Sequence, residues 1–187
     1  MEFNLNNEEK KYLLQLARET IKAQLHEQPL PEPEPITENL KTKTGAFVTL
    51  NKNGRLRGCI GYVIGLKPLY QAIPDLALAA AFNDPRFPPL QKDEWDDLQI
   101  EISVLTPLQK VNDVNEIEVG KHGLMVRQGF YEGLLLPQVA TEYGWDRNTF
   151  LNETCLKAGL PPEAWQDPET EIFKFSALIF SEDEIGA

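Results

Sequence analysis

The sequence has few cysteines, few histidines and no long apolar run. With two of each in 187 residues, it has neither the cysteine density of a secreted disulfide scaffold nor the ligands of a dedicated zinc site. No apolar stretch reaches the roughly 18 residues that a membrane span requires, and the N-terminal "MEFNLNNEEKKYLL" lacks the apolar core of a signal peptide. We therefore expect a protein without bound metal that lies in the reducing cytoplasm and in no membrane.

Several catalytic and nucleotide-binding motifs are also missing. The chain contains no G-x-x-x-x-G-K-[ST], G-x-G-x-x-G, H-E-x-x-H, C-x-x-C or G-x-S-x-G, so nothing indicates a bound cofactor or a common hydrolase. The formal net charge of −11 argues against nucleic-acid binding, which normally needs a basic face.

The hydrophobic patterns predict helices mixed with hairpins. Apolar residues at four-residue spacing predict a helix from Asn7 that ends before Pro29, and "QPLPEPEP" predicts an extended strap. Alternation in "LQIEISVL", Leu98 to Leu105, predicts a strand with Ile100 and Ile102 in the core. This mixture favours an α+β fold with a mostly antiparallel sheet flanked by helices. The other expected elements are hairpins over 45–63 and 123–137, helices over 67–82 (kinked or restarted at Pro74), 137–143 and 144–160, one late strand over 171–180 and a charged tail over 181–187.

The stretch "GRLRGCIGYV" combines two arginines with a cysteine on the second strand of the first hairpin. Strand alternation places Arg55, Arg57, Cys59 and Gly61 on one face. A cationic neighbour favours the thiolate form of a cysteine, so Cys59 is a candidate reactive thiol. The alternative is that Cys59 is a small buried hydrophobe.

Two glycines and an excess of basic residues mark the same region as a candidate binding site. Gly58 and Gly61 permit a bulge or the close approach of a ligand. From Asn39 to Pro74 there is no acidic residue, and the basic residues there would attract and orient a small anionic ligand. Alternatively, they pair with acids elsewhere in the fold. These basic residues are Lys41, Lys43, Lys52, Arg55, Arg57 and Lys67.

Four further residues are candidates for the same site. Glu101 could pair with Arg57 or act as a base near Cys59 if its strand lies beside the Arg57 strand; otherwise it lies on a solvated face. His122, between two glycines in "GKHGL", is a candidate base or a surface turn residue. Asp84 and Arg86 in the rigid loop "NDPRFPPL" either brace that loop or form the wall of a cleft.

The hexapeptide "LRGCIG", Leu56 to Gly61, resembles the signature of the AMMECR family, whose prokaryotic members are called AmmeMemoRadiSam system protein A. The resemblance continues in family order through "GAFVTL", "AAAFNDPRFPPL", "IEISVLTP", "GKHGL", "GLLLPQVATEYGWD" and "FLNETCLKAGL". The length is that of one domain, residues 1–187. The proline-rich segment could be a linker between domains, but the helix before it is too amphipathic to stand alone, so we expect the helix and strap of 1–40 to pack on the body. The resemblance implies two unequal lobes, with "LRGCIG" near a cleft between them.

The family resemblance supplies no established reaction, and two functions stay open. The first is an enzyme or enzyme subunit that binds a small anionic substrate in the cleft: Cys59 would be the reactive thiol, Arg55 and Arg57 would orient the anion, and Glu101 or His122 would be the base. The second is a non-catalytic binding or adaptor module. Its implied partners are Memo-like and radical-SAM proteins, because prokaryotic relatives are often encoded near them.

Overall fold

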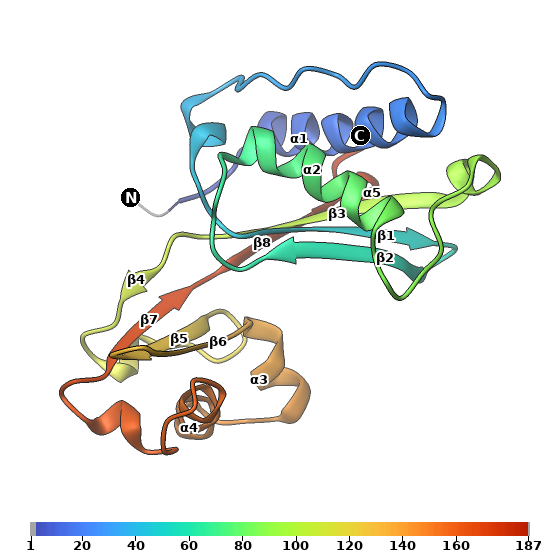
Figure 1. The fold of residues 1–187 in the computed structure, drawn as a ribbon. Coiled ribbons are helices and arrows are strands. Elements are labelled where there is room, and N and C mark those ends of the chain that lie inside the picture. Colours follow the sequence, from blue (N-terminus) through green and yellow to red (C-terminus); the bar gives the residue numbers. More distant parts are fainter. Residues whose placement is uncertain (1–2, 187) are drawn as a thin grey trace. The chain divides into compact units, whose positions relative to one another are not determined.

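The computed structural model describes residues 3–186, so residues 1, 2 and 187 of the expected domain lie outside the described residues. The chain divides into two compact units of unequal size. The first comprises the chain up to Leu105 together with the segment from Leu178 onward, and the second is Thr106–Ala177. Each unit combines helices with a four-stranded sheet (Figure 1), which confirms the expected α+β class.

The first unit is a sheet covered by helices. The sheet has the strand order β2-β1-β3-β8, and β1 pairs antiparallel with both β2 and β3. Helices α1 and α2 pack on one face of this sheet (Figure 1), where they bury the alternate residues Leu98, Ile100, Ile102 and Val104 of β3 as expected. Its elements are α1 (Asn7–Leu25), η1 (Glu38–Lys41), β1 (Ala46–Lys52), β2 (Arg55–Tyr62), α2 (Leu69–Phe82), η2 (Lys92–Asp97), β3 (Leu98–Leu105), β8 (Ala177–Ser181) and α5 (Glu182–Ile185).

Local side-chain contacts define the start of α1 and hold the proline-rich strap against it. Asn6 accepts a hydrogen bond from the backbone N–H of Glu9, whose carboxylate accepts one from the N–H of Asn6. This reciprocal pair satisfies N–H groups that have no partner within the helix. The Tyr12 hydroxyl donates to the carbonyl of Glu34 at 2.6 Å, and the Thr37 hydroxyl donates to Glu9 at 2.6 Å. The strap therefore packs on the first unit.

Helix α2 runs without interruption through Pro74. The expected restart at this proline is wrong, since the helix is continuous from Leu69 to Phe82. A proline in a helix removes one backbone hydrogen bond. The helix compensates by burying a broad apolar face, to which Pro74 itself belongs.

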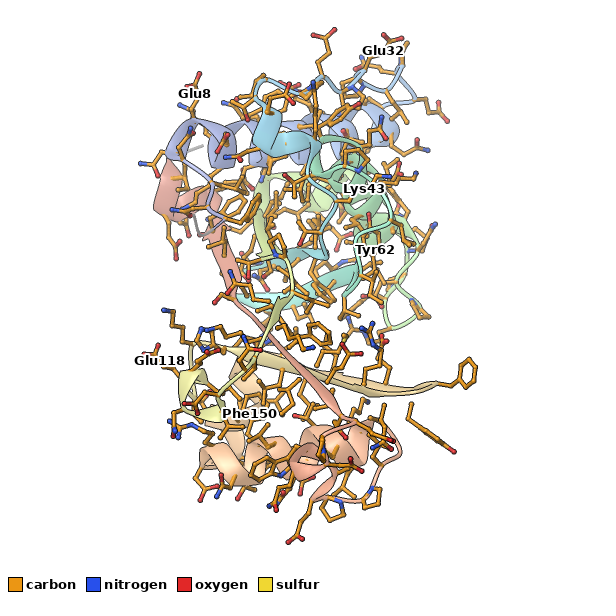
Figure 2. The ribbon with its side chains drawn as sticks, turned by 90° about the vertical axis from the view of Figure 1, so that its left-hand side faces the viewer. Glu8, Glu32, Lys43, Tyr62, Glu118 and Phe150 are labelled. Carbon is orange, nitrogen blue, oxygen red and sulfur yellow. The ribbon has the colours of Figure 1, made fainter. Side chains whose placement is uncertain are left out.

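The second unit has the strand order β4-β7-β5-β6, in which β7 pairs antiparallel with β4 and β5, and β5 pairs antiparallel with β6. Helix α4 packs on β5 and β6, and its Phe150 lies in the interior (Figure 2). Cys155 on the same helix is fully buried, as its position four residues after Leu151 predicts. The elements are β4 (Gln109–Lys110), η3 (Val114–Glu116), β5 (Gly123–Gln128), β6 (Tyr131–Leu135), α3 (Pro137–Tyr143), α4 (Arg147–Lys157), η4 (Ala164–Gln166) and β7 (Glu171–Phe175).

The chain beyond residue 170 differs from the expectation. The single strand expected over 171–180 is two strands, β7 and β8, which end and begin on either side of Ser176 and belong to different sheets. The charged tail contains the short helix α5, and its Glu182 accepts hydrogen bonds from Arg18 at 2.6 Å and from the N–H of Ile100 at 2.7 Å. Because β8 lies next to β3 in the first sheet, the second unit is an insertion between two neighbouring strands.

None of the helices within residues 3–186 combines the length and the apolar character needed to cross a bilayer.

Candidate functional site

A bulge at Arg57 interrupts β2. Leu50 pairs with Gly58 and the next residue of β1, Asn51, pairs with Leu56, so Arg57 is an extra residue without a partner on β1. Paired residues share a sheet face. The bulge therefore interrupts the alternation of side chains between the two faces of the sheet. Leu56 is 43% exposed, whereas Arg57 is only 8% exposed.

The bulge corrects the expectation that Arg55 shares a face with Cys59. Arg55 pairs with Lys52, whereas Cys59 pairs with Thr49. Lys52 and Thr49 are three residues apart on β1, so they lie on opposite faces of the sheet. Arg55 therefore lies on the other face and is exposed.

The Arg57 side chain is buried in an ion pair with Glu94 of η2. Its Nε donates to Glu94 Oε1 at 2.9 Å, and its Nη2 donates to Glu94 Oε2 at 3.0 Å and to the carbonyl of Pro88 at 2.8 Å. Lys52 adds a third cationic contact to Glu94 at 3.0 Å. The hydrogen bonds from Arg57 are the main reason that the pKa of Glu94 falls to about 2.

One nitrogen of Arg57 has no partner. Among the described residues, Nη1 of Arg57 is buried without a hydrogen bond. Buried donors are normally satisfied, so an orphaned donor calls for an explanation. Arg57 is therefore a buried arginine with N–H groups on Nη1 that no acceptor satisfies.

The loop after α2 holds the free edge of β2. The N–H of Cys59 donates to Asp84 Oδ2 at 2.9 Å, and Arg86 Nη2 donates to the carbonyl of Cys59 at 3.3 Å. Arg86 also donates to Asp84 through Nε and Nη2 at 3.1 and 2.8 Å. These bonds, those from Arg86 first, hold the pKa of Asp84 well below its usual range. Asp84 and Arg86 thus brace the edge strand at Cys59 as well as their own loop.

The Cys59 thiol lies on the face of the sheet that α1 and α2 leave open. The thiol is half-buried, and the Thr49 hydroxyl donates to its Sγ at 3.2 Å. The ring of Phe87 lies 5.5 Å from the Arg86 guanidinium carbon and 5.9 Å from that of Arg57. Two cationic groups and the cysteine strand therefore meet around one loop.

Gly58 and Gly61 allow close backbone packing. A Cβ at Gly58 would lie 2.1 Å from the carbonyl oxygen of Ala80 in α2, and a Cβ at Gly61 would lie 2.2 Å from that of Ala46. Gly58 therefore lets α2 approach the edge strand. The sequence predicts that a ligand or backbone approaches closely at Gly58. In this structure helix α2 of the protein itself makes that approach.

Glu101 does not lie on a strand next to β2. Strand β1 separates the two, and Thr49 pairs with Cys59 on one side and with Glu101 on the other. The condition for direct contact between Glu101 and the "LRGCIG" strand is therefore not met. The Glu101 side chain is half-buried, and its pKa is raised, by burial first and then by the Glu184 carboxylate.

His122 lies in the second unit, whereas Cys59 lies in the first. The alternative of a surface turn histidine is wrong, because His122 is 7% exposed. Its Nδ1 accepts a hydrogen bond from the N–H of Glu118 at 3.0 Å, so the ring orders the turn before β5. Its role as a base for Cys59 stays a prediction.

The basic residues between Asn39 and Pro74 mostly pair with acids. Four of the six form ion pairs, which accords with the second alternative for this stretch. These pairs are Lys41–Glu38, Lys52–Glu94, Arg57–Glu94 and Lys67–Asp75.

Two residues that sequence reasoning missed complete the site. Thr49 contacts the thiol, and Glu94 neutralises Arg57. Glu94 lies 37 residues from Arg57 in sequence, and no local pattern signals this contact. Within residues 3–186, no three His, Cys, Asp or Glu side chains come together in a way that could hold a metal ion.

Comparison with known proteins identifies the family. Residues 14–180 match the family model described as AMMECR1. A protein of Methanothermobacter thermautotrophicus is 46% identical over 186 residues, covering 96% of this chain and 97% of the relative. The crystal structure of the uncharacterized protein PH0010 from Pyrococcus horikoshii is similar, with a TM-score of 0.69 and 45% identity over 92% of this chain and 90% of that one. The chain belongs to the AMMECR1 family.

Proposed function

We propose that the protein is an enzyme or an enzyme subunit in which Cys59 is the reactive thiol and a small anionic substrate binds beside it. The observation that carries the proposal is the way Cys59 is held. Its N–H and its carbonyl are both bound by side chains of one loop, Asp84 and Arg86, while Cys59 itself is only partly buried. A reacting group gains most when the backbone that carries it is held rigidly by its neighbours.

The charges around Cys59 suit a thiolate and an anion. The Arg86 side chain is 55% exposed, and its pKa is raised, first by its side-chain hydrogen bonds to Asp84. The unpartnered Nη1 of Arg57 is buried, so Arg86 is the accessible arginine that would contact a carboxylate or phosphate. His122 stays a candidate base. The proposal also takes the protein to act in the cytoplasm.

Two alkylating reagents that differ in charge test this proposal. Iodoacetamide is neutral and iodoacetate is anionic, so the ratio of their rates reports the local charge at the thiol. We expect folded Cys59 to react faster than the same residue in the chain unfolded by urea, and to favour iodoacetate relative to that reference. Mass spectrometry of the peptide that contains Cys59 separates it from the buried Cys155.

Two arginine variants test whether Arg86 causes the preference of Cys59 for iodoacetate. Arg86→Gln should remove the preference for iodoacetate, whereas Arg55→Gln, on the opposite face, should keep it. A folded Cys59 that reacts more slowly than the unfolded chain with both reagents, and without preference between them, would remove the proposal.

A second candidate function, a binding or adaptor module, is favoured by a different observation. Three apolar residues directly after the "LRGCIG" strand are exposed: Val63 by 39%, Ile64 by 53% and Leu66 by 71%. Exposed apolar clusters of this kind mark protein-binding surfaces. The proposed partners are Memo-like and radical-SAM proteins.

Co-purification with a Memo-like or radical-SAM protein separates the two functions. The double variant Ile64→Ser with Leu66→Ser should lose the partner, while Cys59→Ser should keep it. Retention of the partner by the double variant would exclude this surface as the adaptor site.

A further inference from the structure

Three side chains form a row across the open face of the first sheet. Thr49 on β1 pairs with Cys59 on β2 and with Glu101 on β3. Paired residues project from the same face, and all three side chains are half-buried. The neighbours Val48 and Leu50 are fully buried on the helix side, so the row lies on the face that α1 and α2 leave open.

Thr49 is the link in this row. Adjacent strands lie about 4.8 Å apart, so Cys59 and Glu101 are separated by roughly 10 Å at the backbone. The Thr49 hydroxyl already donates to Cys59 Sγ at 3.2 Å. A hydroxyl has a single proton to donate, so that proton can go to the sulfur or to the Glu101 carboxylate, and not to both.

We infer that Thr49 is a catalytic residue: its hydroxyl donates to the Cys59 thiolate, and the Glu101 carboxylate competes for the same proton. The inference rests on the proposed function, because it takes Cys59 to be the reactive group. A hydrogen bond to the charged form of a group favours that form. Thr49 therefore favours the thiolate, while an ionised Glu101 opposes it by drawing away the hydroxyl and by repelling the negative sulfur.

Other charged groups act on the ends of the row. Asp84 and Arg86, from the loop after α2, hold the backbone of Cys59, and their opposite charges pair with one another. Glu184 of α5 acts on Glu101, and burial together with this carboxylate raises the pKa of Glu101. Substitution of Thr49 changes none of these charges, so its effect on the thiol isolates the hydroxyl.

The test compares iodoacetamide alkylation rates of Cys59 at pH 7 in matched variants. Thr49→Val keeps the shape of the side chain and removes the hydroxyl, and should slow the reaction about three- to tenfold. Thr49→Ser restores the hydroxyl and should restore most of the rate. Glu101→Gln removes the competitor and the negative charge, and should speed the reaction about two- to threefold. Ser103→Ala, on the same face of β3, should leave the rate unchanged.

The outcomes distinguish this inference from the proposed function. If wild-type Cys59 reacts more slowly than in the unfolded chain with both reagents, and without preference between them, both fail. If wild-type Cys59 is reactive and Thr49→Val reacts equally fast, only the role of Thr49 fails. Equal losses in Thr49→Val and Thr49→Ser would show that packing rather than the hydroxyl matters. A slower Glu101→Gln would overturn the competition and favour Glu101 as a base. Circular dichroism spectra establish that each variant is folded.

Discussion

Replacement of Glu94 by glutamine should destabilise the protein in a pH-dependent way. The pKa of Glu94 falls from 4.5 to about 2 in the folded chain, and each pKa unit corresponds to about 1.4 kcal/mol. The ionised carboxylate therefore contributes about 3 kcal/mol to the free energy of unfolding at neutral pH. Little of this is lost to solvent screening, because the Glu94 side chain is only 14% exposed.

The sign of the pH dependence follows from the lowered pKa. Because the folded state holds the ionised form, the stabilisation is complete above pH 4.5 and is lost as the pH falls towards 2. At pH 3 the contribution should have fallen to roughly 1.4 kcal/mol. The stability difference between wild type and Glu94→Gln should shrink in the same way.

Urea unfolding followed by far-ultraviolet circular dichroism at pH 7 and pH 3 measures this difference. Glu38→Gln is the matched control, since Glu38 also pairs with a lysine but is 87% exposed; surface pairs of this kind contribute little. We expect the control to match the wild type at both pH values. The reasoning is refuted if Glu94→Gln is as stable as the wild type at pH 7, or if its deficit is the same at pH 3.

Two further substitutions test the contacts that hold the Cys59 strand. Asp84→Ala removes the acceptor of the Cys59 N–H and should make that amide exchange with deuterium at least several-fold faster, while Asp75→Ala should not; equal exchange in both variants would show that Asp84 does not hold this edge. Gly58→Ala places a Cβ against the carbonyl oxygen of Ala80 and should lower the free energy of unfolding in urea by about 1–3 kcal/mol. Gly61→Ser, at another crowded glycine of the same strand, serves for comparison, and a loss no larger than its loss would still be consistent with crowding. An unchanged free energy of unfolding in Gly58→Ala would refute the crowding at Gly58.

Local patterns in the sequence were sufficient for most elements. The strict alternation from Leu98 to Leu105 predicts β3 and its buried residues correctly, because strand periodicity depends only on neighbouring positions. The hairpin around Asn53 and Gly54 is also predicted correctly. Both residues have positive φ, 51° and 77°, as a two-residue hairpin turn requires.

The order of the strands and their register could not be predicted, because both depend on contacts between residues that are distant in the sequence. With a regular register from the turn, Thr49 would face Gly58, and only the bulge at Arg57 moves it opposite Cys59. Gly58 permits a bulge in this strand, but the sequence alone does not place the bulge at Arg57, because the contacts around it are long-range: the ion pair of Arg57 with Glu94 and the packing of Gly58 on α2. The expected proximity of Glu101 to Arg57 fails for a similar reason: β1 lies between their strands.

The division of the late strand was not visible in sequence either. "EIFKFSALIF" has apolar residues throughout and no glycine or proline to mark an interruption. The break occurs at Ser176, whose N–H and carbonyl bond to Thr106 at 2.7 Å each. A partner 70 residues away thus sets the point at which one strand ends and the next begins.

The insertion of the second unit between β3 and β8 has a consequence for biosynthesis. A ribosome releases Thr106–Ala177 as one continuous segment, so this unit has all of its residues before the first unit does. The first sheet receives its outer strand, β8, only when residues 177–181 emerge, after the whole second unit. Until then the side of β3 that β8 will cover is an open edge, which is the kind of surface on which nascent chains aggregate. A chain that ends just before Leu178 would therefore lack most of the outer strand of the first unit, although its second unit would be complete.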